Sequence, residues 1–487
     1  MAQFSQSPQI NQISRSTILK WLLLALFGLF VVRLFYIQVI QHGYYVDLAY
    51  NTQVSKLTLV PERGKIYALD GETIIPLVLN EAVYTVFGVP QEVEDVAQVK
   101  ASLKAIPDVT LLEDSFNILA DEDTESRYVV LARNLTRTQA ETIQKKQLAG
   151  VGLQKGTRRV YPEGSMAAHV LGYVNNDNEG QYGFEEFNNE RLKGTAGLLQ
   201  SVTDVRQIPL TIGEEDIQTP ARDGENVVLT IDRNIQSKAE ELLKAGVEKV
   251  GATKGSIVVL DPQTGAVKAM ANVPTYEPAS YSKVDDYATF VNGVVSTPYE
   301  NGSVIKTLTM GAGLDSGSVT INSTFNDTTG CTSVDGARIC NVEEDPKTAA
   351  ASMLDTLRYS LNTGVVHVLR QMGGGTVNQR ARETLATYFT QNYRYGKLTG
   401  VEQANEVKGI IAGPNDGDGR NVRYANMSFG QGMDTTMIQT TAAFAAAVSG
   451  GTYYKPTLIK GTLDAEGNLK EKKPLVVEGA GLSAKAS

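Results

Sequence analysis

One apolar run near the N-terminus constrains this chain more than any other feature. Every residue from Trp21 to Val32 is apolar or glycine, and after Arg33 the run resumes and ends at Ile40. As a helix, residues 21 to 40 would extend about 30 Å, which matches the hydrocarbon core of a bilayer. The run therefore predicts one transmembrane helix.

A cleaved signal peptide is the alternative interpretation of this segment. The run is long, however, and it is followed by HGYYVDLAYN rather than by a small-residue cleavage site. Arg15 and Lys20 precede it and no lysine follows closely, which predicts a cytoplasmic N-terminus. We expect Arg33 to extend its charge to the membrane surface. The prediction is a cytoplasmic tail over residues 1–17, an anchor over 18–40 and an extracytoplasmic remainder.

Length and charge limit the function classes. A chain of 487 residues is long enough for two or three domains. Its net charge of −9 and the lack of a basic run argue against a nucleic-acid partner. Of the three histidines, only His367 lies in the C-terminal half, and the valines around it predict a packed helix position. Any serine nucleophile in that half is therefore expected to use a lysine as its base.

The segment YENGSVIKTLTM, residues 299–310, contains such a pair. Asn301-Gly302 signals a turn, and the apolar residues that follow Ser303 predict a helix packed into a core. Lys306 lies three residues after Ser303, so both side chains share one helix face. A lysine whose pKa is lowered by burial can take the serine proton, and the helix N-terminus offers N–H groups to an oxyanion. A solvated helix face is the alternative, because S-x-x-K is a short motif.

The two cysteines, Cys331 and Cys340, flank Asp335-Gly336, which is a strong hairpin signal. Outside the cytosol they could form a disulfide across this hairpin, and two free thiols are the alternative. A zinc site is not expected, because no further cysteine and no histidine lies nearby.

Residues 41–222 are predicted to form a strand-rich domain that binds or positions other molecules. No spacing typical of a catalytic site occurs there. The segment GSMAAHVLGYV, residues 164–174, is expected to be buried, whereas Glu185 and Glu186 are interpreted as surface charges.

Residues 223–487 are predicted to form a second domain of α+β class. Asp232 is expected to cap a helix whose apolar positions follow helical spacing, namely Ile235, Ala239, Leu242, Leu243 and Val247. A hairpin is expected over residues 255–272. The remaining elements are helices near 350–372, 376–389 and 435–448, and a strand near 452–460. Helices between an early hairpin and a late strand predict a mixed sheet covered by helices.

Many ordered segments resemble the class B penicillin-binding proteins, the membrane-anchored transpeptidases that crosslink peptidoglycan in division or elongation. They include RLFYIQVIQHGYY, RGKIY, YPEGSMAAHVLGYV, GFEEFNNERLKGTAG, LTIDRNIQ, VVLDPQTGAVKAMANVPTYEP, YGKLTGVEQANEVKG and FGQGMDTTMIQTTAAFAAAVSGG. The resemblance implies that residues 41–222 are the pedestal domain, of the dimerisation type, and that residues 223–487 are the penicillin-binding transpeptidase domain.

The family signature has three parts, S-x-x-K, S-x-N and K-[ST]-G. Ser303 to Lys306 fits the first, and Ser360-Leu361-Asn362 fits the second. The third does not occur after residue 433, so the domain is expected to be incomplete at its C-terminal side and these 487 residues to be impaired.

The resemblance also implies a mechanism. Lys306 takes the proton of Ser303, which attacks the D-Ala-D-Ala bond of a stem peptide; Ser360 relays a proton to the leaving D-alanine, and Asn362 holds the donor amide. An amine of a second stem peptide then resolves the acyl-enzyme, and a β-lactam blocks Ser303. Implied partners are peptidoglycan stem peptides on lipid-linked precursor strands, β-lactams and a membrane glycosyltransferase; no cofactor and no metal are implied.

Three alternatives share these motifs. One is a β-lactamase or β-lactam sensor, the second a D,D-carboxypeptidase, and the third a non-catalytic scaffold of a wall-synthesis complex. The anchor and the pedestal segments argue against a secreted β-lactamase.

Overall fold

The structure, a computed structural model, describes residues 15–45, 54–121, 123–202 and 217–487. They divide into two compact units, Met1–Val60 with Ala196–Arg222 and Pro61–Thr195 with Asp223–Ser487. The domain boundaries that the sequence suggests stay predictions, and the predicted tail lies mostly outside the described residues.

The first unit holds the apolar helix and a small sheet. Helix α1, Arg15–Phe35, continues as a π-helical turn, Tyr36–Ile40. Within Ser16–Ile40 an 18-residue window reaches a mean hydropathy of 2.3, and no other helix in the described parts of the chain is both long and apolar enough to cross a membrane. The expected long apolar helix is therefore confirmed. The sheet is antiparallel in the order β1-β8-β9, with strands Val54–Leu59, Gly197–Val202 and Ile217–Thr219.

The second unit is built on a seven-stranded sheet in the order β19-β18-β10-β2-β3-β4, with β5 also paired to β3. Its strands are β2 Ile66–Asp70, β3 Thr73–Gly88, β4 Val129–Leu135, β5 Val151–Val160, β10 Asn226–Asp232, β18 Ile459–Leu463 and β19 Leu469–Glu471. β10 and β2 are parallel, and the other pairs are antiparallel. Strands from both sides of residue 222 thus share one sheet.

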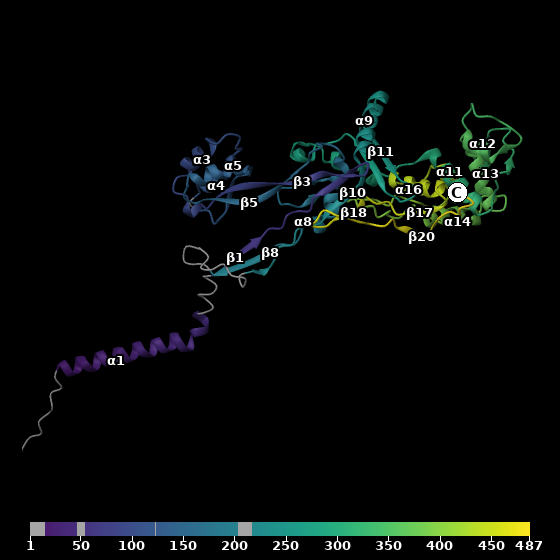
Figure 1. Ribbon diagram of the computed structural model, residues 1–487. Helices are drawn as coiled ribbons and strands as arrows, with labels where there is room; N and C mark the ends of the chain where they lie inside the picture. The colour runs from purple at the N-terminus through teal and green to yellow at the C-terminus, as the bar shows by residue number, and fades with distance from the viewer. Residues whose placement is uncertain (1–14, 46–53, 122, 203–216) are drawn as a thin grey trace, which may run out of the picture. The chain divides into compact units, whose positions relative to one another are not determined.

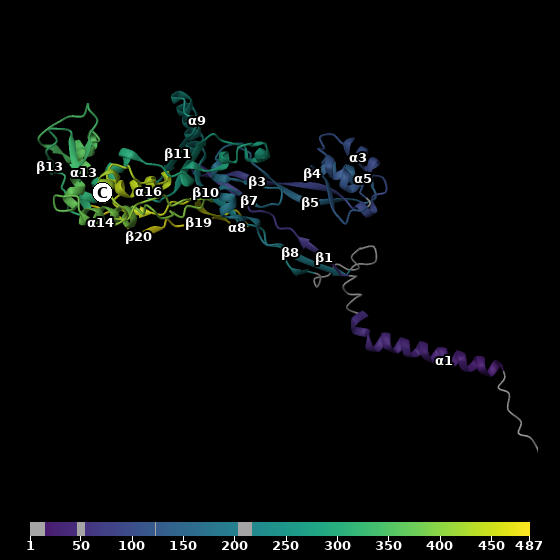
Figure 2. The ribbon, with the colours of Figure 1, turned by 180° about the vertical axis from the view of Figure 1, so that it is seen from behind.

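Two groups of helices lie at opposite ends of this unit (Figures 1 and 2). One group packs on the long strands β3 to β5 and consists of α3 Val96–Lys104, α4 Glu113–Leu119 and α5 Arg137–Lys145. The other group consists of α11 Ile305–Asp315, α12 Met353–Arg358, α13 Asn362–Met372, α14 Gln379–Thr387, α15 Arg420–Met427 and α16 Met437–Val448. Each group has its own apolar core.

Short elements connect these parts. They are α6 Ala168–Leu171, β6 Tyr173–Val174, β7 Gly180–Gln181, α7 Gly183–Phe187, α8 Asn189–Lys193, α10 Gly293–Ser296, β13 Thr324–Phe325, β14 Cys331–Val334, β15 Ala337–Cys340, β16 Ala351–Ser352, β17 Thr452–Tyr454 and β20 Val476–Gly481. All four residues of α6 are buried, as expected for the apolar segment 164–174.

The expected hairpins and the capped helix are present. β11 Gly255–Leu260 and β12 Val267–Val273 pair in antiparallel fashion, and so do β14 and β15 around Asp335-Gly336. Asp232 accepts hydrogen bonds from the first turn of α9, Arg233–Val250, as an N-cap does. Not every apolar position of α9 is buried: Ile235 and Leu242 are 39% and 55% exposed, because the face that packs on β11 and β12 is centred on Ala239 and Leu243.

Two predicted elements are interrupted. The helix near 350–372 is divided into α12 and α13, because Ser360 between them has a φ of 54°. The strand near 452–460 is divided into β17 and β18 around Pro456, which has no N–H to give to a strand ladder. The helices predicted at 376–389 and 435–448 are confirmed as α14 and α16, each slightly shorter than expected.

The interpretation of Glu185 as a surface charge is wrong. Its side chain is fully buried between two buried arginines, Arg63 and Arg159, and receives hydrogen bonds from both. A carboxylate tolerates burial when cations with well-directed donors surround it. Glu186 is exposed, as expected.

Candidate active site

Ser303 lies in a short turn that leads directly into α11. The turn is a single 3₁₀ turn, Gly302–Val304, and α11 begins at Ile305. Ser303 is exposed, and in the described parts of the chain its hydroxyl forms no hydrogen bond. Lys306, one turn further along, is only 3% exposed. The predicted nucleophile therefore faces solvent, whereas the predicted base lies below the surface.

Lys306 and Ser360 are in direct contact. The Lys306 Nζ atom donates to the backbone carbonyl of Ser360 and lies 2.9 Å from the Ser360 Oγ atom. Burial lowers the pKa of Lys306 to about 8, and the nearby Asp345 carboxylate acts in the opposite direction. At such a pKa a substantial fraction of the amine is neutral at physiological pH, which a proton acceptor requires.

The backbone at Ser360 determines this contact. The residue adopts a left-handed conformation with a φ of 54°, which is uncommon for a residue with a side chain. Immediately afterwards the Leu361 N–H bonds to the Thr356 carbonyl at 2.9 Å, and the Leu361 side chain is buried. The chain is thus turned so that both oxygens of Ser360 face Lys306. Strained backbone of this kind often occurs at functional sites.

Asn362 is the first residue of α13, and its side chain is half-buried. Its Nδ2 atom donates to the Cys340 carbonyl at 2.8 Å. The Sγ atoms of Cys331 and Cys340 are 2.21 Å apart, so the structure pairs the two cysteines at the open end of the β14–β15 hairpin. The hairpin and the predicted S-x-N turn are therefore neighbours.

A loop of the FGQGM segment packs against the turn that carries Ser303. The Gly302 N–H donates to the Gly430 carbonyl at 3.0 Å. Gly430 has a φ of +86°, and a Cβ atom there would lie 2.0 Å from the Gly302 carbonyl oxygen. The Gly432 N–H donates to the Glu300 carboxylate at 2.6 Å. Glycine at position 430 is required by this close backbone approach.

Sequence reasoning missed several polar residues near the predicted site residues Ser303, Lys306, Ser360 and Asn362. The Asp345 carboxylate raises the pKa of Lys306. Asn341 accepts a hydrogen bond from Thr363 at the start of α13 and donates one to Asp327. The available signal was their position beside the hairpin, with Asp327 before it and Asn341 and Asp345 after it, but polar residues in a loop have many other uses. His367 stacks on Phe325 at 5.1 Å in α13, as expected for a packed helix residue.

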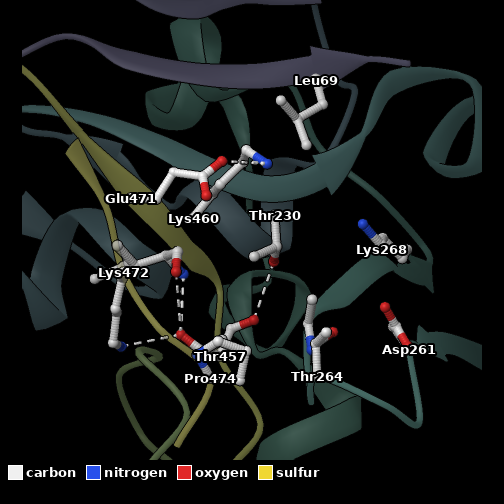
Figure 3. Close-up of a pocket in the computed structure, with 12 residues that line it drawn as sticks. Leu69, Thr230, Asp261, Thr264, Lys268, Thr457, Lys460, Glu471, Lys472 and Pro474 are labelled. Carbon is white, nitrogen blue, oxygen red and sulfur yellow. Dashed lines mark hydrogen bonds and ion pairs between the residues drawn. The ribbon is translucent and has the colours of Figure 1, made fainter. Parts of the chain in front are cut away.

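The pocket in Figure 3 is separate from these residues. Its volume is about 200 Å³, and it is lined by three lysines, Lys268, Lys460 and Lys472, together with residues of β10, β12 and β18. Two of these lysines are paired, one with Glu471 and the other with Glu402. A second, more apolar pocket of about 360 Å³ includes Val304, the neighbour of Ser303. Within the described ranges, no group of three or more histidine, cysteine or acidic side chains could hold a metal ion.

Two family models match the chain in the order that its domains were predicted. Residues 58–229 match the penicillin-binding protein dimerisation domain, and residues 255–485 match the penicillin-binding protein transpeptidase domain. The chain is a class B penicillin-binding protein. Both predicted site motifs, Ser303 to Lys306 and Ser360 to Asn362, lie inside the transpeptidase match.

The curated relatives of this class B penicillin-binding protein include a sporulation protein and several peptidoglycan D,D-transpeptidases. Stage V sporulation protein D of Bacillus subtilis is 29% identical over 477 residues, which cover 95% of this chain and 70% of that protein. Peptidoglycan D,D-transpeptidase FtsI of Escherichia coli K12 is 27% identical over 402 residues, 82% of this chain and 64% of the relative. The chain thus spans about two thirds of the length of these proteins.

Solved structures agree on the fold. Penicillin Binding Protein 2X from Streptococcus thermophilus superimposes with a TM-score of 0.65 at 23% identity, covering 89% of this chain and 65% of that structure. A peptidoglycan synthetase from Bifidobacterium adolescentis gives a TM-score of 0.64, also at 23% identity, over 89% of this chain and 80% of that structure. The predicted α+β architecture of this class B penicillin-binding protein is confirmed.

Proposed function

We propose that this chain carries the acyl-serine site of a peptidoglycan D,D-transpeptidase, with Ser303 as nucleophile, Lys306 as base, Ser360 as proton relay and Asn362 as substrate-binding residue. The observation that carries the proposal is the buried Lys306 amine held against Ser360, one helical turn after an exposed serine. A lysine with a lowered pKa, one helical turn from an exposed serine, can accept the proton of that serine when substrate binds.

The proposed reaction gives a step to the serine and lysine side chains. Neutral Lys306 accepts the Ser303 proton as the Oγ atom forms a bond to the carbonyl carbon of the penultimate D-alanine of a stem peptide. The C–N bond to the terminal D-alanine breaks, the Ser360 hydroxyl passes its proton to the leaving amine, and Ser360 regains a proton from the protonated Lys306 amine. The amine of a second stem peptide then attacks the ester, which forms the crosslink and returns the proton to Ser303.

The test is intact-mass analysis of the chain after incubation with benzylpenicillin. We expect one penicilloyl adduct that is absent in Ser303→Ala and unchanged in Ser316→Ala, a matched control at an exposed serine near the end of the same helix. An adduct that persists in Ser303→Ala, or no adduct in any form, contradicts the proposal. Release of penicilloate would favour a β-lactamase, and release of D-alanine without crosslinked dimer would favour a carboxypeptidase.

We further propose that these 487 residues alone acylate slowly. Residues 434–487 contain no K-[ST]-G, and within the described ranges β11 pairs only with β12. In the family, the strand with that motif supplies one oxyanion donor, and the loss of one such donor lowers a rate by roughly 10²- to 10³-fold. The comparison is the acylation rate beside that of full-length peptidoglycan D,D-transpeptidase FtsI of Escherichia coli K12, and equal rates contradict this proposal.

Partners and orientation belong to the same proposal. The substrates are stem peptides on lipid-linked precursor strands, the inhibitors are β-lactams, and the functional partner is a membrane glycosyltransferase of the division or elongation machinery. The apolar helix fits a single membrane anchor, and Arg15 and Lys20 favour a cytoplasmic N-terminus. Protease protection of a tag at residue 1 in spheroplasts tests this orientation.

A further inference from the structure

The first turn of α13 is held by a short polar network outside the proposed catalytic residues. The Asn341 Oδ1 atom accepts hydrogen bonds from the Thr363 N–H at 3.0 Å and from the Thr363 hydroxyl at 3.1 Å. The Asn341 Nδ2 atom donates to the Asp327 carboxylate at 2.8 Å. Asp327 is only 2% exposed. One amide side chain therefore bridges a buried carboxylate and the N-terminus of a helix.

The network is anchored to the disulfide-closed hairpin. Asn341 follows Cys340 directly, and its N–H donates to the Gly330 carbonyl at 2.9 Å, on the segment that leads into β14. The Cys340 carbonyl in turn accepts from Asn362. Two consecutive residues of the hairpin exit thus contact two consecutive residues at the start of α13.

We propose that Asn341 is a positioning residue of the transpeptidase site, which with Asp327 sets the orientation of the Ser360-Leu361-Asn362 turn against Lys306. This inference rests on the function proposed above. Asn341 touches no substrate in this assignment; it acts by holding the helix end from which the turn projects.

The chemistry of the bridge explains why an asparagine is suited to this place. The helix N-terminus presents N–H groups that need acceptors, and the Asp327 carboxylate needs a donor. A carboxamide has both an acceptor and a donor, whereas an aspartate at 341 would place two carboxylates side by side and an alanine would leave Thr363 and Asp327 without this partner. The buried negative charge near the start of α13 is itself favourable to the helix dipole.

The link to catalysis is geometric. Ser360 holds Lys306 through its carbonyl and hydroxyl oxygens, and only Leu361 separates it from α13. A rotation of the helix end would therefore move both acceptors of the lysine amine. A displacement of about 1 Å in a catalytic group lowers a rate by up to about 10²-fold.

The experiment exchanges the two groups of the bridge. In the full chain we compare Asn341→Ala, Asn341→Asp, the double variant Asn341→Asp/Asp327→Asn, and the matched control Asn326→Asp, an exposed asparagine next to Asp327. The double variant keeps one carboxylate and one amide but reverses them, so the amide at 327 donates to the carboxylate at 341, which still accepts from Thr363. The reaction with a fluorescent penicillin is followed at several penicillin concentrations. This gives separately the dissociation constant of the non-covalent complex and the rate constant of acylation.

We expect both single variants to lower the acylation rate constant by about 10- to 100-fold, with a dissociation constant that changes less than threefold. The double variant should return to within about threefold of the parent chain, and Asn326→Asp should not differ from it. A double variant as slow as Asn341→Asp, or single variants at the parent rate, overturns the proposal.

Hydrogen exchange separates this outcome from a failure of the proposed function. Exchange in peptides that contain Thr363 should accelerate in Asn341→Ala and return toward the parent rate in the double variant, whether or not the chain reacts with penicillin. If the parent chain forms no Ser303 adduct, the proposed function fails while exchange still decides the bridge. Unchanged exchange in Asn341→Ala overturns the positioning role.

Discussion

The buried carboxylate of Glu185 compensates two buried arginines in the second unit, and its removal gives a sharp prediction. Its Oε2 atom lies 2.9 Å from Arg63 Nε and 2.5 Å from Arg63 Nη2, and its Oε1 atom lies 2.9 Å from Arg159 Nε. Arg63 is 1% exposed and Glu185 is 0% exposed. Two guanidinium groups thus share one carboxylate away from water.

Glu185→Gln keeps the volume of the side chain but removes the charge that compensates both arginines. Breaking a buried ion pair by removing one partner typically lowers the free energy of unfolding by about 3–5 kcal/mol. Arg63 retains hydrogen bonds to Asn189 and Asn178, so we expect a value near the lower end, about 3 kcal/mol. Glu186→Gln is the matched control: its side chain is exposed and the expected loss is under about 1 kcal/mol.

The assay is urea unfolding of the full chain in detergent, followed by circular dichroism at 222 nm. Fluorescence is unsuitable because the single tryptophan, Trp21, lies in the apolar helix and does not report on this unit. Hydrogen exchange in peptides that contain Arg63 or Glu185 localises the effect. If both variants lose less than about 1 kcal/mol, the three side chains do not form the buried cluster described here.

Three further predictions concern the candidate site. The rate of acylation should rise with pH and reach half its maximum near pH 8, because only neutral Lys306 accepts a proton. Asp345→Asn should move this midpoint to lower pH, because the Asp345 carboxylate raises the pKa of the lysine. A midpoint that Asp345→Asn leaves unchanged contradicts this prediction. Replacing Cys331 and Cys340 by serine opens a loop with a sequence separation of 9. The free energy of unfolding, measured by urea titration, should fall by about 2–3 kcal/mol. No loss would indicate free thiols in the parent chain. Gly430→Ala should lower the acylation rate by at least about tenfold while the circular dichroism spectrum is preserved, because the added methyl group would lie 2.0 Å from the Gly302 carbonyl oxygen. A rate equal to that of the parent chain would show that the loop is free to shift.

Local patterns predicted the elements that depend on nearby residues alone. Asp232 at a helix start and Asp335-Gly336 between two short strands each define their element through hydrogen bonds or dihedral angles within a few residues. The spacing from Ser303 to Lys306 placed both residues within one turn for the same reason. Such predictions succeed because no distant partner is needed.

Features that depend on residues far apart in the chain could not be predicted from the sequence. Glu185 resembles its exposed neighbour in sequence, and its burial requires Arg63, which is 122 residues away. Likewise, the parallel pairing of β10 with β2 joins strands 161 residues apart, as in Val227 opposite Ile66. Hydrophobic periodicity shows which face of an element is apolar but not which element covers that face, so the pairing of strands from both sides of residue 222 in one sheet could not be predicted.

The site itself combines both kinds of information. S-x-x-K is a local pattern, but the base works only if Lys306 is buried, and its burial depends on a turn 54 residues later. That turn requires Ser360 to adopt a left-handed backbone, for which the sequence offers no glycine signal. Because an isolated residue with a side chain is strained in this conformation, its neighbours must hold it there. The buried Leu361, whose N–H bonds to the Thr356 carbonyl, provides that restraint, and the proposed Asn341 bridge adds to it at the start of α13. The position of the lysine base thus depends on residues outside the proposed catalytic set.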